Sequence, residues 1–192
     1  MIQSRRDFLK NAGKIAVAAS VASALPMSVV AEKAEHPFKY VHLDPDATAD
    51  RAYAAFTQVG GCCASVAEAI IGQLAEVVGA PFDGVPIQMF TNGGAGYGQS
   101  SLCGCIGGAA ACIGLVCDKA TSSAILGELC AWYRETNLPI YDKQEKALAQ
   151  VVPGSVNCAD SLGDPGRVVR CSCLAADVSK KTVELLNAHY GV

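Results

Sequence analysis

Cysteine is the residue type in this chain that can do the most chemistry. Ten cysteines occur among 192 residues, at positions 62, 63, 103, 105, 112, 117, 130, 158, 171 and 173. The thiolate form of cysteine binds metal ions and attacks disulfides. Because six of the ten lie in close pairs, at 62–63, 103–105 and 171–173, the spacing predicts a redox or metal-binding role for the sulfur atoms.

Three cysteines, Cys63, Cys103 and Cys173, fall where the sequence pattern predicts that a helix begins. Helix N-termini have unpaired N–H groups and a partial positive charge, which lower the pKa of a thiol. If these N-termini converge, their thiolates suit an iron–sulfur cluster. We therefore predict such a cluster, with Cys63, Cys103 and Cys173 as main ligands and Cys171 as a further metal ligand. The remaining candidates for cofactor binding are Cys62, Cys105 and Cys158.

The other three cysteines have apolar neighbours. Cys112, Cys117 and Cys130 lie among Ala, Ile and Leu residues. A free cysteine in such a setting packs as a small apolar side chain. We expect these three to be core residues.

Two other functions remain open for the same cysteines. Cys103-Gly104-Cys105 could form a redox-active disulfide, as in a thiol–disulfide oxidoreductase. Ten cysteines in an exported protein could also pair as disulfides that hold together a structural module. The sequence contains neither Cys-x-x-Cys nor Cys-x-x-Cys-His, so a thioredoxin-type centre and a covalently attached c-type haem are not expected.

Apolar periodicity predicts an all-α fold, a bundle of about five helices. An irregular loop over residues 136–170 precedes the last helix, and residues 86–90 read as a short extended segment. The glycines at 94, 96 and 98 do not match the Gly-x-Gly-x-x-Gly dinucleotide fingerprint, so we expect them to permit close backbone approach. The expected helices cover residues 45–56, 64–78, 102–117, 121–134 and 172–189.

The N-terminus carries a predicted export signal. Residues 4–10, Ser-Arg-Arg-Asp-Phe-Leu-Lys, match a twin-arginine signal, and a weakly apolar stretch follows over residues 15–25. We predict a twin-arginine signal peptide at 1–31 and a single cysteine-rich redox domain at 32–192. The apolar stretch is too short for a membrane anchor. Because the twin-arginine route exports folded proteins, it favours a periplasmic protein whose cofactor is inserted before export.

The charge pattern excludes one class of partner. The formal net charge is −3, and no run of Lys or Arg follows the first 14 residues. A nucleic-acid-binding surface normally needs clustered basic residues. We therefore expect no nucleic-acid partner.

Several segments resemble the redox-active proteins named for the motif C_GCAxxG_C_C, and in particular their split-Soret cytochrome c branch. Cys63-Ala64-Ser65-Val66 is similar to the first cysteine segment of the family. The glycines at 94–98, followed by Cys103-Gly104-x-x-x-Gly108, resemble the central motif, although Cys105 stands where the family has Ala. Residues 137–141 and the tail from Cys158 resemble the split-Soret branch.

The resemblance implies a helical, periplasmic electron-transfer protein that binds iron–sulfur. We expect an electron carrier, and the sequence leaves open whether the protein is also an enzyme. It also implies a homodimer that exchanges electrons with redox partner proteins. Split-Soret members carry c-type haem as well. This chain has no haem-attachment motif, so haem is not carried over to it.

Overall fold

The computed structural model describes residues 35–161 and 167–192, which belong to one compact unit. The signal peptide predicted at 1–31 lies outside the described residues. The α-helices are α2 (Pro45–Ala55), α3 (Cys62–Ala67), α4 (Gln73–Val78), α5 (Gly104–Val116), α6 (Lys119–Glu135) and α7 (Arg167–Tyr190). Shorter helical turns are η1 (Glu68–Gly72), η2 (Phe82–Gly84), η3 (Ile87–Gly93) and η4 (Gly96–Ser100).

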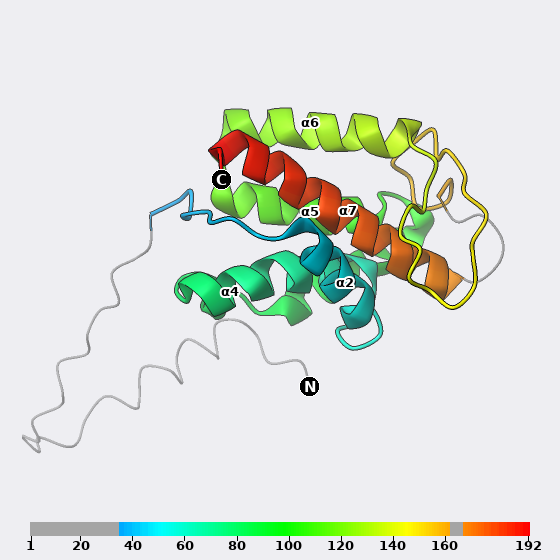
Figure 1. The fold of residues 1–192 in the computed structure, drawn as a ribbon, viewed down its shortest axis with the longest axis horizontal. Coiled ribbons are helices and arrows are strands. Elements are labelled where there is room, and N and C mark those ends of the chain that lie inside the picture. Colours follow the sequence, from blue (N-terminus) through cyan, green and yellow to red (C-terminus); the bar gives the residue numbers. More distant parts are fainter. Residues whose placement is uncertain (1–34, 162–166) are drawn as a thin grey trace, which may run out of the picture. The chain divides into compact units, whose positions relative to one another are not determined.

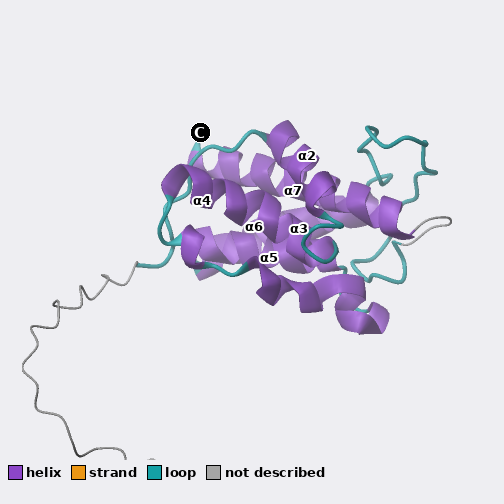
Figure 2. Ribbon diagram, turned by 90° about the horizontal axis from the view of Figure 1, so that it is seen from below, coloured by secondary structure: helices purple, strands orange, loops and turns teal. Residues whose placement is uncertain are grey.

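The prediction of an all-α bundle is confirmed. The described residues contain helices and two isolated β-bridges but no β-sheet. Segments α3, η1 and α4 follow one another without a break, so they form one helix with a π-helical turn at its centre. The longest helix, α7, packs against α2, α3, α5 and α6. Figures 1 and 2 show α7 between α2 on one side and the α5–α6 pair on the other.

One expected helix boundary and one expected element type were wrong. The C-terminal helix begins at Arg167 rather than at residue 172, so Cys173 lies in its second turn and not at its N-terminus. Residues 86–90 are not extended, because Ile87–Gly93 form the 3₁₀ turns of η3. Apolar periodicity distinguishes short helical turns from extended segments poorly, since both are too short to show a period.

Helices α3 and α5 approach closely because glycines face the contact. A Cβ atom on Gly108 would lie 2.6 Å from the carbonyl oxygen of Cys63 and 3.1 Å from Cβ of Val66. A Cβ atom on Gly104 would lie 2.5 Å from Sγ of Cys62. Gly104 and Gly108 therefore permit close backbone approach. Of the three loop glycines expected to do so, Gly96 does, because a Cβ there would lie 2.6 Å from the backbone nitrogen of Ser101, whereas a Cβ on Gly98 would meet nothing within 4 Å.

The loop between α6 and α7 is held by buried polar contacts. Arg170 is 1% exposed and donates hydrogen bonds to the carbonyl oxygens of Ser161, Ala149 and Leu138 at 2.7–3.0 Å. Buried polar groups are costly unless they are paired, and this guanidinium satisfies three loop carbonyls at once. Arg170 therefore fixes the path of the loop.

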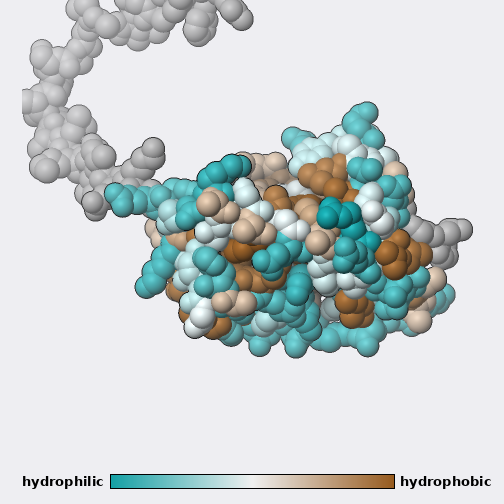
Figure 3. All heavy atoms as spheres, turned by 90° about the horizontal axis from the view of Figure 1, so that it is seen from above, coloured by the Kyte–Doolittle hydropathy of each residue, from teal (hydrophilic) through white to brown (hydrophobic). Residues whose placement is uncertain are grey.

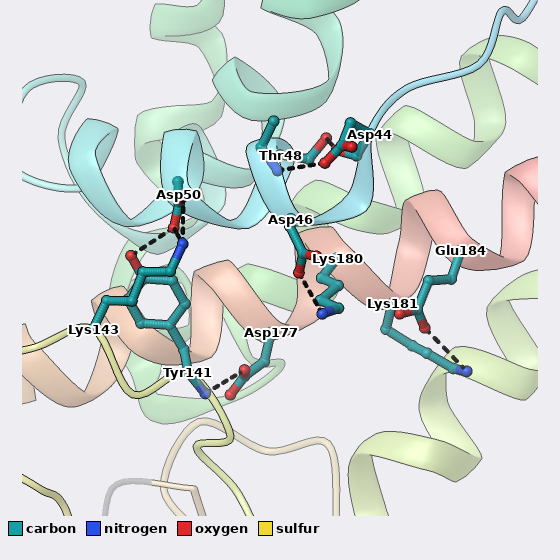
Figure 4. Close-up of polar contacts among 11 residues, drawn as sticks. Asp44, Asp46, Thr48, Asp50, Tyr141, Lys143, Asp177, Lys180, Lys181 and Glu184 are labelled. Carbon is teal, nitrogen blue, oxygen red and sulfur yellow. Dashed lines mark hydrogen bonds and ion pairs between the residues drawn. The ribbon is translucent and has the colours of Figure 1, made fainter.

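A second set of polar contacts joins the same loop to α2 and α7 (Figure 4). The carboxylate of Asp177 on α7 accepts hydrogen bonds from the backbone N–H groups of Ile140 and Tyr141, both at 2.8 Å. Asp50 on α2 pairs with Lys143 of the loop at 2.6 Å. These contacts join the start of the loop to both helices.

No helix in the described part of the chain is long and apolar enough to span a bilayer. Figure 3 shows mostly hydrophilic atoms on one face, interrupted by apolar patches.

The α3–α5 contact provides a stability test. We expect Gly108→Ala to lower the free energy of unfolding by about 1–3 kcal/mol, because the new methyl group overpacks a contact with backbone. Gly114→Ala is the matched control in the same helix, since a Cβ there meets nothing within 4 Å. The control should stabilise the protein by up to about 1 kcal/mol. Urea unfolding of both variants makes the comparison, and equal effects would contradict the packing argument.

Candidate metal centre

Five cysteines line one cavity of about 140 Å³ between the start of α3, the start of α5, the loop before α7 and the first turns of α7. They are Cys62, Cys103, Cys105, Cys158 and Cys171. The rest of the lining consists of Phe56, Gly61, Gly94, Ala95, Ser161, Val168 and Leu174. Among the described residues of this lining, none is Lys, Arg, His, Asp or Glu, so sulfur is the dominant side-chain donor atom that they supply.

The helix starts position three of these thiols. Cys62 is the first residue of α3 and follows Gly60 and Gly61, whose positive φ angles let the chain turn sharply into the helix. Cys103 is the N-cap of α5, and Cys105 lies in the first turn of the same helix. The expectation that cysteines gather at helix N-termini therefore holds for α3 and α5.

The loop before α7 supplies Cys158 through backbone pairing. The N–H of Cys103 donates to the carbonyl oxygen of Val156 at 2.8 Å, and the N–H of Cys158 donates to that of Ser101 at 2.5 Å. These hydrogen bonds run alongside the bridge between Leu102 and Asn157. Two segments far apart in the sequence are thereby brought to the same cavity.

Helix α7 separates the two cysteines that it contributes. Each residue of an α-helix is rotated by about 100° from the one before it. Cys171 and Cys173 are two residues apart, so their side chains point to nearly opposite sides of the helix. Cys171 lines the cavity, whereas the Cys173 thiol donates a hydrogen bond to Oε1 of Gln144 at 3.6 Å. Burial, followed by the charge of Asp177, raises the pKa of Cys173 to about 11. Cys173, predicted as a main ligand, is therefore not part of the cavity lining.

The vicinal pair on α3 is divided in the same way. Cys62 faces the cavity, while Cys63 is 4% exposed and packs against η3, since a Cβ on Gly93 would lie 2.5 Å from its Sγ. Burial raises the pKa of Cys63 to about 11, and charge on Cys62 and Cys103 adds to the shift. Cys63, also predicted as a main ligand, lies outside the lining.

The remaining cysteines pack with apolar side chains. Cys112 and Cys117 belong to the buried core, and Cys130 packs against it. Burial raises the pKa of all three thiols, which opposes thiolate formation. Their position in the core agrees with the interpretation of the sequence.

Hydrogen bonding favours thiolates inside the cavity. The Cys105 thiol stabilises charge on Cys62 and lowers the pKa of Cys62 to about 6, against the opposing effect of burial. Backbone N–H groups, first that of Ala95, lower it further. Cys105 likewise lowers the pKa of Cys103, and its own pKa is raised because its proton is held between two sulfurs. Three sulfurs thus share protons, and negative charge accumulates at the cavity.

A tyrosine completes the surroundings of Cys103. The hydroxyl of Tyr133 on α6 donates a hydrogen bond to Sγ of Cys103 at 3.3 Å. No sequence pattern indicates this contact, because an aromatic residue in an apolar helix normally signals packing alone. The two residues meet only because α5 and α6 lie side by side.

The lining supplies the thiol donors that an iron–sulfur cluster would need. Two thiolates on one zinc ion lie within about 4.6 Å of each other, which is twice the Zn–S bond length. Within residues 35–161 and 167–192, no group of three His, Cys, Asp or Glu side chains is arranged to hold one metal ion. A cluster distributes its thiolate ligands over more than one iron and is held by Cys sulfur. Five thiols around a cavity satisfy that requirement.

Comparison with known proteins agrees with the motif. The family model of putative redox-active proteins named C_GCAxxG_C_C matches residues 45–185. The chain belongs to this family. The segment of this chain that resembles the central motif contains the two glycines, Gly104 and Gly108, that bring α3 and α5 together. Membership in the C_GCAxxG_C_C family confirms the resemblance found from the sequence.

A curated relative and a solved structure to which the chain is similar are both split-Soret cytochromes c. Split-Soret cytochrome c from Desulfovibrio desulfuricans (strain ATCC 27774 / DSM 6949 / MB) is 30% identical over 164 residues, covering 76% of this chain and 59% of the relative. A structure described as a novel iron centre in the split-Soret cytochrome c from Desulfovibrio desulfuricans ATCC 27774 matches with a TM-score of 0.76 and 27% identity. It covers 80% of this chain and 72% of the solved one. The chain thus spans 59% of the curated relative's length.

Thiolate formation in metal-free protein has a definite pH dependence. Cys62 should ionise near pH 6, so its thiolate absorbance rises as the pH passes through that value. Because its pKa is lower in the folded state than the ordinary 9.0, unfolding takes up a proton. The lowered pKa of Cys62 therefore adds to the free energy of unfolding. This added stability is complete above about pH 9 and is lost as the pH falls through about 6.

Cys105 is the residue to change in this titration. In Cys105→Ala, the midpoint of the thiolate titration should move to a higher pH than in the wild type. The reason is that Cys62 and Cys103 lose their main hydrogen-bond partner. Cys105→Ser is the matched control, since a hydroxyl still donates. Ultraviolet absorbance against pH makes the measurement. An unchanged titration in Cys105→Ala would contradict the shared-proton arrangement.

Proposed function

We propose that this protein is an exported electron carrier that holds an iron–sulfur cluster in the five-cysteine cavity. The observation that carries the proposal is the lining itself, in which thiols converge from α3, α5, α7 and the intervening loop. Thiolate-only donor sets favour Cu(I), zinc or iron–sulfur clusters among biological metals. Among the described residues, no three such side chains are grouped around a single point. Thiols that instead surround a cavity favour a cluster.

The residues of this chain would divide the task between binding and shielding. The ligands would come from Cys62, Cys103, Cys105, Cys158 and Cys171. When bound, the cluster would supply one-electron transfer. Phe56, Val168 and Leu174 line the same cavity and would limit contact with water. The backbone N–H of Ala95 already stabilises charge on Cys62 and would do so for a ligand sulfur.

The solved relative supports an iron cofactor. That protein is a split-Soret cytochrome c described as having a novel iron centre, and it shares its fold with 80% of this chain. The proposal does not extend to c-type haem, because the sequence contains no Cys-x-x-Cys-His.

A thiol–disulfide oxidoreductase is the second candidate function. Cys103 has a lowered pKa and shares a hydrogen bond with Cys105, which is the relation expected of an attacking thiolate and its partner. Cys62, Cys63, Cys103 and Cys105 are present as thiols in the structure.

The test of the cluster compares the cysteine of each pair that lines the cavity with the one that does not. We expect iron and acid-labile sulfide to fall by half or more in Cys62→Ala and Cys171→Ala, because each change removes a sulfur from the cavity. Cys63→Ala and Cys173→Ala are matched controls on the same helices and should keep both elements at the wild-type level. Iron, sulfide and visible spectra are measured on protein purified without oxygen.

Three outcomes separate the functions. Equal iron and sulfide with broad charge-transfer bands would establish a cluster. A wild-type protein that stays free of metal after anaerobic reconstitution, yet reduces disulfides through Cys103, would favour the oxidoreductase. Loss of the cluster from the control variants instead would show that the ligands are the ones expected from the sequence alone.

Export and assembly are part of the proposal. We place the protein in the periplasm, as a homodimer that exchanges electrons with redox partner proteins. Replacing Arg5 and Arg6 by Lys should block export, because the twin-arginine route recognises the paired arginines. Cell fractionation tests this, and a periplasmic double-Lys variant would contradict it. Light scattering on the purified protein tests the dimer.

A further inference from the structure

We propose that the hydroxyl of Tyr133 tunes the reduction potential of the iron–sulfur centre through its hydrogen bond to the sulfur of Cys103. This inference rests on the proposed function and deepens it. It assigns an electronic role to a residue of α6, a helix that contributes no residue to the cavity lining.

The contact is direct and enclosed. The Tyr133 hydroxyl lies 3.3 Å from Sγ of Cys103. Tyr133 is 0% exposed and Cys103 is 4% exposed. Hydrogen bonds in such a low-dielectric interior are electrostatically stronger than in water, and water cannot easily replace the donor.

The hydroxyl is the donor in this contact, and Sγ of Cys103 accepts its hydrogen bond. The ring is held by the surrounding core, so the direction of the donor is fixed by packing.

The sign of the effect follows from charge. Reduction adds one negative charge to the cluster and increases the electron density on its ligand sulfurs. A donor to a ligand sulfur stabilises the reduced state more than the oxidised state, and hydrogen bonds to sulfur are among the factors that set cluster potentials. Removing this donor should therefore lower the reduction potential.

Tyr133→Phe is the direct test, because it removes the hydroxyl and keeps the buried ring. We expect wild-type iron and sulfide content with a lower reduction potential, measured by anaerobic redox titration of the visible bands. Tyr40→Phe is the matched control. The hydroxyl of Tyr40 also donates a hydrogen bond, to Oδ1 of Asn187 at 2.8 Å. Tyr40 is not among the residues that line the cavity. The control should leave the potential unchanged.

A second measurement covers the case in which Tyr133→Phe does not assemble. Incorporation of 3-fluorotyrosine at position 133 makes the phenol a stronger donor and should raise the potential, whereas incorporation at position 40 should not. An unchanged potential with fluorotyrosine at 133, or equal potentials in the wild type and Tyr133→Phe, would overturn the inference. Absence of iron and sulfide from the wild type would instead reject the proposed function, so the two failures are distinguishable.

Discussion

Everything at the candidate centre depends on burying thiols so close together that they share protons. Desolvation alone opposes thiolates, as it does at Cys63 and Cys112. The cavity overcomes it at Cys62 and Cys103 with hydrogen bonds from Cys105. Such an arrangement of sulfur is costly in an apolar core unless a cation or cluster takes up the charge. The electrostatics of the site therefore point toward metal.

The close approach of α3 and α5 makes this arrangement possible. Side chains at Gly104 or Gly108 would collide with Cys62, Cys63 or Val66, and the helices would separate. Interiors are packed too tightly to absorb an added methyl group without a shift. The glycines of the family motif are thus part of the site, although none of them carries a functional group.

The loop between α6 and α7 is the second support. Arg170 binds three loop carbonyls from within α7, and short backbone pairing fixes the loop beside the start of α5. One end of α7 therefore organises both the loop that carries Cys158 and the helix turn that carries Cys171. Loss of either contact would loosen the part of the cavity that Cys158 and Cys171 line.

The sequence by itself determined the all-α class, the approximate helices, the redox family and the restriction of the candidate site to cysteines. These properties follow from local periodicity, spacing and residue chemistry. Only the tertiary structure decided which thiol of each pair faces the cavity. Cys62 lines it rather than Cys63, and Cys171 rather than Cys173, because helix start and rotation set each direction. The contact of Tyr133 with Cys103 joins residues 30 positions apart, and only the packing of α5 against α6 produces it.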